Sequence, residues 1–518
     1  MIRDSIWFLW FCSHPFSFNG NVDAENPLSQ TASKTRKATQ KSVQLVDTGE
    51  ESKEQLGRFE TEQLINAISK IADLLRKCWG VAGAGIISSN LARTKGGKTV
   101  VFNPTVPGKR VYALFGFIAI NEFSQLLRDL ENDVMLLIND VARVVHDEVY
   151  RWALGDSGQC NKNLGSAFLM VFRIGDFSEV HQKKKRATDV VFNSQMKHNV
   201  KLRRRSLAKK ASRRGRKGGN RHFDINNDGT LQLASLPGIQ SFTDRALLGL
   251  LKSFAGIHRD RQLQYKWKKD FRFGGGVGAF TTTVIYGMDA GWAVEGAVGS
   301  EHKIDATYLS PHVNMASRMM SATKQYGVTI LLSQAVEELL SRPARDKLRH
   351  LDTVYVKGSS VAQRIFTYDA RYEGVDFFLF ERPPEQADLE AEAYTQNIWD
   401  VDQDLRSMRQ HVSEEFAERF KEGVDHYLEG DWQSAIECLQ DADDIMIQTV
   451  LEEGYIDYDV GGLEQEVFNR KTSNEEINRI RNEFGDGASK CLISYMQRNA
   501  VDGKAPPDWN GVHHLMSK

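Results

Sequence analysis

Residues 288–320, MDAGWAVEGAVGSEHKIDATYLSPHVNMASRMM, carry the most specific local pattern of this 518-residue chain. Glycines recur through the first half, where 291–298 is typical of a strand. The second half leads into residues 313–326, which have the apolar spacing of a helix. Asn314 and Arg318 stand four residues apart there and therefore share one helical face. The stretch predicts a strand followed by a helix that presents an amide and a guanidinium together.

The flanking sequence predicts more strands and helices. Continuous apolar runs are typical of buried strands, and apolar residues three or four apart are typical of amphipathic helices. We expect strands at 111–120, 165–174, 279–288, 353–357 and 364–368, and helices at 59–79, 123–150 and 333–340. The order strand, helix, strand, strand, helix, strand predicts a ferredoxin-like α+β domain over residues 108–372.

A net charge of −1 hides a strong local asymmetry. Residues 183–221 are basic, whereas 384–405 and 412–463 are acidic. The balanced total predicts no nucleic-acid partner for the chain as a whole. We expect 178–235 to be a disordered insertion. For its run RRRSLAKKASRRGRK, binding to anionic lipid, binding to nucleic acid and a nuclear-import signal stay open as alternative functions. The run lacks aromatic residues on which bases could stack, so base stacking is unsupported.

The cysteines and the apolar runs of the sequence indicate in which cellular compartment the protein works. The five cysteines lie far apart, without a CxxC pair or a Cys/His cluster, so the sequence suggests neither a disulfide framework nor a zinc site. A reducing compartment is the default. The apolar run at 6–12 is far shorter than the roughly 20 residues that span a bilayer. We expect a cytoplasmic protein without a transmembrane segment, associated with a membrane only through a partner.

Outside the α+β domain, we expect a disordered segment at 1–57, a helical segment at 58–100 that either packs or couples signals, and a helical region at 373–518. In the last region, 412–428 and 432–447 form a helical pair similar to one tetratricopeptide hairpin. Gly430 suits the end of the first helix and Asp431 the start of the second.

A short polar segment, DINNDGTLQLAS at 224–235, begins like a calcium-binding EF-hand loop. Its twelfth position is Ser235 instead of a bidentate glutamate, and no helix-forming sequence precedes it. We expect a polar turn there.

Several segments together resemble the catalytic domain of class III nucleotidyl cyclases, in a branch found in protists. They are FGFIAINEFSQL (115–126), NKNLGSAFLMV (161–171), the stretch 288–320, VYVKG (354–358) and EGDWQSAIECLQDAD (429–443). The resemblance implies that two domains pair head to tail around a site that converts a nucleoside triphosphate into a cyclic nucleotide. It also implies Mg²⁺ or Mn²⁺, held by two aspartates.

The resemblance assigns expected roles to five residues. Asn314 and Arg318 would orient the ribose and stabilise phosphate charge. Lys162 and Thr307 would recognise the purine, and this pair favours ATP over GTP. Lys357 would reach the triphosphate.

The chain departs from the family at the two metal-binding positions, where Ala119 and Ser166 replace aspartates. Alanine has no ligand atom, and a neutral hydroxyl is a poor ligand for Mg²⁺. Glu122 and Asp176 are the nearby carboxylates that could substitute. The sequence therefore predicts a purine- and ribose-binding half-site that needs an aspartate-bearing partner domain for its metal. The alternatives are a homodimer with two metal-deficient sites and an inactive pseudocyclase that acts as a regulatory or scaffold subunit.

Overall fold

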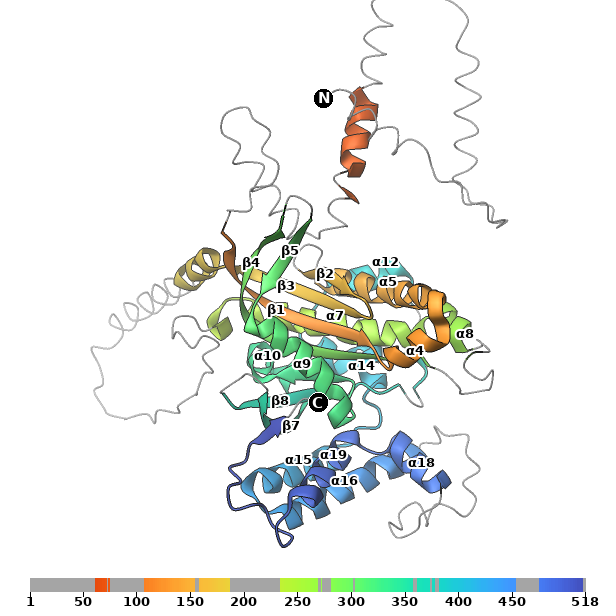
Figure 1. Ribbon diagram of the computed structural model, residues 1–518, viewed down its shortest axis with the longest axis vertical. Coiled ribbons are helices and arrows are strands. Elements are labelled where there is room, and N and C mark those ends of the chain that lie inside the picture. Colours follow the sequence, from red (N-terminus) through yellow and green to blue (C-terminus); the bar gives the residue numbers. More distant parts are fainter. Residues whose placement is uncertain are drawn as a thin grey trace, which may run out of the picture. The chain divides into compact units, whose positions relative to one another are not determined.

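The computed structural model (Figure 1) describes residues 61–71, 73–74, 107–153, 158–186, 233–268, 272, 281–300, 303–356, 361–372, 375–377, 382–452 and 475–515. The chain forms two compact units, Met1–Asp73 and Leu74–Lys518. In the first unit, residues 61–71 are helical, which confirms part of the helix expected at 59–79. The expected disordered segment 1–57, most of the basic segment 183–221, the EF-hand-like loop up to residue 232, and Lys357 lie outside the described residues. None of the described helices combines the length and the apolar character needed to cross a membrane.

A mixed sheet organises the second unit. The described strands follow the order β2-β3-β1-β4-β6-β8-β7-β9, and β5 pairs with the C-terminal half of β4. Their bounds are β1 Lys109–Ile120, β2 Gly158–Leu164, β3 Ala167–Asp176, β4 Val284–Gly299, β5 Ile304–Leu309, β6 Ile330–Ser333, β7 Leu348–Val356, β8 Gln363–Tyr368 and β9 His513–Leu515. The pairs β4–β6 and β7–β9 are parallel, and the other pairs are antiparallel.

Helices cover both faces of this sheet (Figure 1). Their bounds are α4 Phe123–Leu130, α5 Val134–Trp152, α7 Ile239–Arg259, α8 Arg261–Lys268, α9 Pro311–Tyr326, α10 Gln334–Leu339, α11 Arg342–Arg345, α12 Pro384–Glu392, α13 Ile398–Val401, α14 Gln403–Ser407, α15 Glu414–Glu429, α16 Trp432–Glu452, α18 Glu475–Phe484 and α19 Gly487–Asn499.

The central strand β1 sorts its side chains between two cores. Tyr112, Leu114 and Ile118 join the core formed with α5 and α7. Val111 and Phe115, on the opposite face, join the core that contains Ala316 of α9. This alternation follows from the two-residue period of a strand. Because both faces are buried, β1 reads as an uninterrupted apolar run, and the strand predicted at 111–120 is confirmed.

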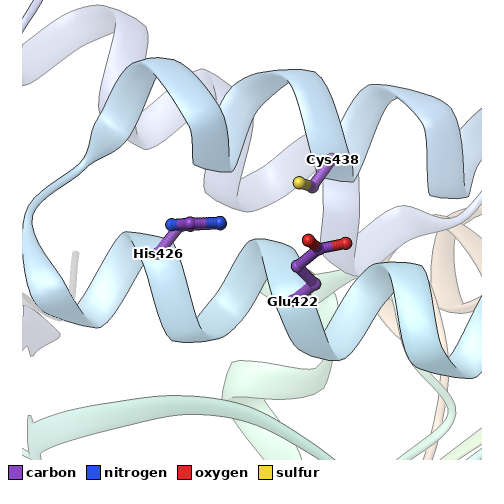
Figure 2. Close-up of side chains that lie close together, drawn as sticks. All are labelled: Glu422, His426 and Cys438. Carbon is purple, nitrogen blue, oxygen red and sulfur yellow. The ribbon is translucent and has the colours of Figure 1, made fainter.

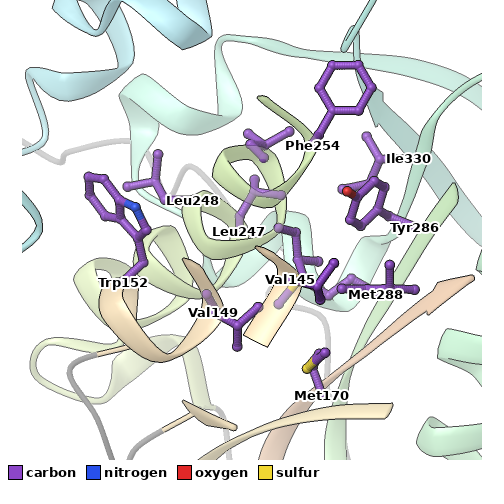
Figure 3. Close-up of a cluster of buried hydrophobic side chains, with 14 of the residues drawn as sticks. Val145, Val149, Trp152, Met170, Leu247, Leu248, Phe254, Tyr286, Met288 and Ile330 are labelled. Atoms are coloured by element: carbon purple, nitrogen blue, oxygen red, sulfur yellow. The ribbon is translucent and has the colours of Figure 1, made fainter. Parts of the chain in front are cut away.

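The larger core joins the sheet to α5 and α7. Figure 3 shows Val145, Val149 and Trp152 of α5 beside Leu247, Leu248 and Phe254 of α7, with Met170, Tyr286, Met288 and Ile330 from the sheet. Each large apolar side chain contributes about 1.5–3 kcal/mol when fully buried. The packed pair α5 and α7 therefore holds the sheet from one side.

Several expected elements differ from the structure. The single helix expected at 123–150 is two helices, because Glu131 between them adopts a left-handed φ of 48°. The strands expected at 279–288 and 291–298 are one strand, β4. The expected disordered insertion at 178–235 has ordered ends, since 177–186 is helical and Leu233–Ser235 forms a 3₁₀ turn. The sequence did not predict β2 or the 21-residue helix α7.

The C-terminal helices pack onto the sheet. α15 and α16 confirm the expected helical pair, with Gly430 at φ 91° between them and the Asp431 carboxylate accepting a bond from the Ser434 backbone N–H at 3.4 Å. They share a core with α19, β7 and the end of α9. The similarity to a tetratricopeptide unit stays a prediction.

A buried ion-pair network ties this helical region to the sheet. Arg349 of β7 is 9% exposed and donates to Asp486 at 2.9 and 3.0 Å and to Asp369 at 2.5 and 3.2 Å. Its guanidinium also lies over the Phe416 and Phe420 rings. Burial opposes ionisation of Asp486, but Arg349 outweighs this effect and holds the pKa of Asp486 below its ordinary value of 3.8.

We expect Arg349→Ala to lower the free energy of unfolding by about 3–5 kcal/mol at pH 7, because it removes the guanidinium that pairs with the buried Asp486 and leaves the buried Asp369 with Arg409 at 3.8 Å. The stabilisation from Asp486 is present above its unfolded pKa of about 3.9 and is lost as pH falls through its lower folded pKa. Denaturant unfolding at pH 7 and pH 3 measures both effects. The exposed Arg342→Ala serves as control, with a change within about 0.5 kcal/mol; equal losses in the two variants would contradict the assignment.

Candidate functional site

Two of the predicted site residues meet across the fold. Lys162 lies on β2 and Thr307 on β5, 145 residues apart, and the Lys162 ammonium donates to the Thr307 hydroxyl at 3.4 Å. The β2–β3 pairing slips by one residue between Cys160 and Lys162, which is an irregularity of the β-bulge type. Such irregularities turn side chains out of the regular alternation. The family resemblance named these two residues as partners and the structure places them in contact, whereas their role in purine recognition stays a prediction.

Two titratable side chains close in sequence to Lys162 and Thr307 keep their protons near neutral pH. Burial raises the pKa of the Cys160 thiol to about 12, so this thiol stays protonated and is a poor nucleophile near neutral pH. Beside Thr307, Tyr308 donates to the Glu295 carboxylate at 3.2 Å, and Arg173 donates to the same oxygen at 3.0 Å. Burial, with Glu295 adding to it, raises the pKa of Tyr308. Cys160 and Tyr308 are therefore neutral near neutral pH, and Glu295 is paired with Arg173.

Asn314 and Arg318 lie one turn apart on α9, as predicted. The helix begins with Ser310, whose hydroxyl accepts a bond from the His312 backbone N–H, and with Pro311 in its first turn. Asn314 is exposed and Arg318 is partly buried. Both stand in the N-terminal half of α9, so their position depends on how that half is fixed to the sheet.

Two features fix α9 to β4. A Cβ on Gly287 would overlap the backbone of Met320, and one on Gly291 would overlap the His312 ring, so both positions require glycine for this close approach. Next to them, the buried Asp289 lies 2.9 Å from His312 Nδ1 and accepts a bond from the Ser333 hydroxyl at 2.5 Å. This Asp289–His312–Ser333 network was not predicted, because its members come from three elements.

The two positions that the family resemblance assigns to metal ligands are adjacent. Ala119 pairs with Ala167 in the β1–β3 register, and the Ile120 backbone N–H donates to the Ser166 carbonyl at 3.0 Å. Ala119 is 7% exposed and Ser166 is partly buried. A methyl and a neutral hydroxyl do not fit Mg²⁺ or Mn²⁺, which favour carboxylate oxygens. Neither side chain offers a carboxylate ligand to a divalent metal at these positions.

The two carboxylates considered as substitutes differ in position. Asp176 pairs with Val111, eight residues along β1 from Ala119, which is about 26 Å at the rise of a strand. The hypothesis that Asp176 replaces a metal ligand is therefore wrong. Glu122 lies two residues after the end of β1, with a left-handed φ of 50° and an exposed side chain. Its role as a substitute ligand stays a prediction.

Comparisons with known proteins connect this geometry to a family. An adenylate cyclase of Anabaena cylindrica is 40% identical over 89 residues, which are 17% of this chain and 18% of that protein. The terminal-differentiation-specific adenylate cyclase of Dictyostelium discoideum is 33% identical over 113 residues, 22% of this chain and 5% of that protein. The chain contains a segment homologous to adenylate cyclases. It spans less than a fifth of the length of these relatives.

Two solved structures are also similar to parts of this chain. A solved bacterial light-regulated adenylyl cyclase aligns with a TM-score of 0.35 and 16% identity, over 65% of this chain and 68% of that one. The adenylyl cyclase CyaB from P. aeruginosa aligns with a TM-score of 0.31 and 16% identity, over 50% of this chain and 95% of that one. Residues 22–92, which precede the mixed sheet in the sequence, match the family described as the RasGEFs all helical domain.

We expect Asp289→Ala to lower the free energy of unfolding by about 2–3 kcal/mol, because it leaves the buried Ser333 hydroxyl and His312 without their acceptor. Urea unfolding measures the change. The matched control is Asp305→Ala on β5, whose exposed pairing with Lys303 contributes at most about 1 kcal/mol. A loss for Asp289→Ala no larger than for the control would show that the network does not fix α9.

Proposed function

We propose that this chain supplies the purine- and ribose-binding half of a nucleotidyl cyclase site, with ATP as the substrate. The observation that carries the proposal is the contact of Lys162 with Thr307. An ammonium can donate to an adenine ring nitrogen, and a hydroxyl can accept from the exocyclic amine. The homology to adenylate cyclases supports this choice of substrate over GTP.

On α9, Arg318 would stabilise the charge that develops on the triphosphate, and Asn314 would orient the ribose. In cyclisation the ribose 3′-oxygen bonds to the α-phosphorus, the bond from that phosphorus to the pyrophosphate oxygen breaks, and the hydroxyl proton is lost. Such a reaction depends mainly on positioning and on charge stabilisation. Arginine suits the task, because its guanidinium stays charged and donates several bonds in one plane.

Ala119 and Ser166 leave the metal-binding half to a partner. The proposal is therefore a heterodimer with an aspartate-bearing cyclase domain, which would hold Mg²⁺ or Mn²⁺ and so activate the hydroxyl. A homodimer of this chain would have two sites without metal ligands. The same two residues also favour a second candidate function, an inactive subunit that regulates or scaffolds its partner. ATP binding at Lys162 and Thr307 separates the two.

The test is complementation. The partner is a class III cyclase domain that keeps both aspartates but has its own catalytic arginine replaced, so that its homodimer is inactive. We expect the full chain with Mn²⁺ and ATP to produce cyclic AMP only in the mixture, and Arg318→Ala to lower this rate about 100- to 1000-fold. Arg342→Ala, which changes an exposed arginine of α11, should leave the rate unchanged.

Activity of this chain alone would contradict the heterodimer hypothesis, and Glu122→Gln would then show whether Glu122 acts as the metal ligand. An inactive mixture in which the chain still associates with the partner but does not bind ATP would favour the scaffold function.

Restoring the acids gives a second prediction. We expect Ala119→Asp combined with Ser166→Asp to give the chain alone a Mn²⁺-dependent cyclase activity at least about 100-fold above background, because both ligands then stand on adjacent strands. Ala119→Asp by itself is the matched control and should stay near background. If the double variant folds and binds ATP but remains inactive, the half-site of Lys162, Thr307, Asn314 and Arg318 is not competent.

A further inference from the structure

The helical pair α15 and α16 brings together three metal-binding side chains far from Lys162 in the sequence. Glu422 and His426 are four residues apart on α15, and Cys438 faces them from α16 (Figure 2). One ligand atom from each residue lies within 4.8 Å of the other two. Donors in a tetrahedral zinc site are about 3.3–3.8 Å apart, as follows from bond lengths of about 2.0–2.3 Å. Rotation of the side chains covers the difference.

The backbone holds these donors close together. A Cβ on Gly423 would lie 2.8 Å from Leu439 Cγ and 3.2 Å from Cys438 Cβ, so glycine lets α15 approach α16 at this level. Gly423 directly follows Glu422, and Cys438 is 4% exposed beneath the carboxylate. The position of the thiol therefore depends on the helix contact and not on a mobile loop.

The donor set selects the kind of metal. A thiol, an imidazole and one carboxylate suit Zn²⁺, whereas Mg²⁺ and Ca²⁺ take oxygen ligands almost exclusively. Glu422 is exposed and His426 is partly buried, so the site opens to solvent on one side. A water molecule can complete four-coordination from that side.

Neighbouring residues support a bound cation. Arg419 donates to one oxygen of Glu422 at 2.6 Å and to Asp441 at 2.6 Å, which orients the Glu422 carboxylate. His426 Nδ1 lies 3.7 Å from the Asp431 carboxylate, beyond hydrogen-bond distance, so the two groups interact only electrostatically. Besides the cation Arg419, four acidic residues lie around these side chains, namely Glu422, Asp431, Glu437 and Asp441. The excess of negative charge favours a divalent ion.

We propose that Glu422, His426 and Cys438 bind Zn²⁺ with water as the fourth ligand, and that the ion fastens α15 to α16. The site stands apart from the cyclase half-site, so its test does not depend on the proposed activity. The sequence did not predict this site, because its cysteine and histidine are twelve residues apart on two helices and match no zinc-ligand spacing.

The experiment is titration of the reduced full chain with Co²⁺, followed by displacement with Zn²⁺. We expect a thiolate-to-cobalt charge-transfer band that saturates at one equivalent and disappears on addition of Zn²⁺. Cys438→Ser should abolish the band. Cys491→Ser, which changes a partly buried cysteine of α19, is the matched control and should keep it. His426→Ala should weaken Zn²⁺ binding at least about tenfold.

Circular dichroism without metal checks that each variant is folded. If Cys438→Ser does not fold, Glu422→Gln changes an exposed side chain and should lower Zn²⁺ affinity without loss of helix. The proposal is overturned if the wild-type chain gives no charge-transfer band with equimolar Co²⁺. It is also overturned if folded Cys438→Ser keeps the band unchanged, or if folded Glu422→Gln keeps the Zn²⁺ affinity unchanged.

Discussion

The close approach of α9 to β4 is the constraint on which the candidate site depends. Gly287 and Gly291 leave no room for a side chain, so the helix backbone rests directly on the strand. The buried Asp289 then fixes the start of α9 through His312 and fixes β6 through Ser333. A carboxylate at this depth is tolerated because polar partners surround it. This contact between α9 and β4 positions Asn314 and Arg318, and no ligand is needed to hold them there.

The other end of α9 is fixed by the C-terminal region. Tyr326 donates to the Asp352 carboxylate at 2.6 Å, and His513 of β9 lies 2.9 Å from the same oxygen. All three side chains are buried, and β9 pairs with β7 beside them. The helix that carries Arg318 is therefore held at its first turn by the sheet and at its last turn by Asp352 of β7, which His513 of β9 also contacts. The C-terminal helices are part of the structural support of the site.

Local sequence pattern predicted elements such as β1 and α9, whose residues carry a clear signal of burial or of helix ends. β1 is apolar throughout because both its faces are buried, and α9 has a capping serine, a first-turn proline and a terminal glycine. The pattern failed for β2, whose sequence GQCNKNL is polar because the strand lies at the sheet edge. It also failed for α7, which follows directly after a basic segment and is buried over most of its surface, so that no amphipathic stripe marks it. The contact of Lys162 with Thr307 was predictable only through the family resemblance, and the Asp289 network depends on packing that no local pattern encodes.

The substitutions at Ala119 and Ser166 have a physical consequence for the fold as well as for the reaction. Two carboxylates on adjacent strands repel each other, and at a position as buried as Ala119 the charge also loses hydration. A bound divalent ion offsets both costs. A chain that does not bind the ion avoids both costs with a methyl and a hydroxyl there, because neither side chain carries a charge. In the function proposed above, Ala119 and Ser166 thus avoid the cost of an acid pair without its ion, while the fold still positions Lys162, Thr307, Asn314 and Arg318.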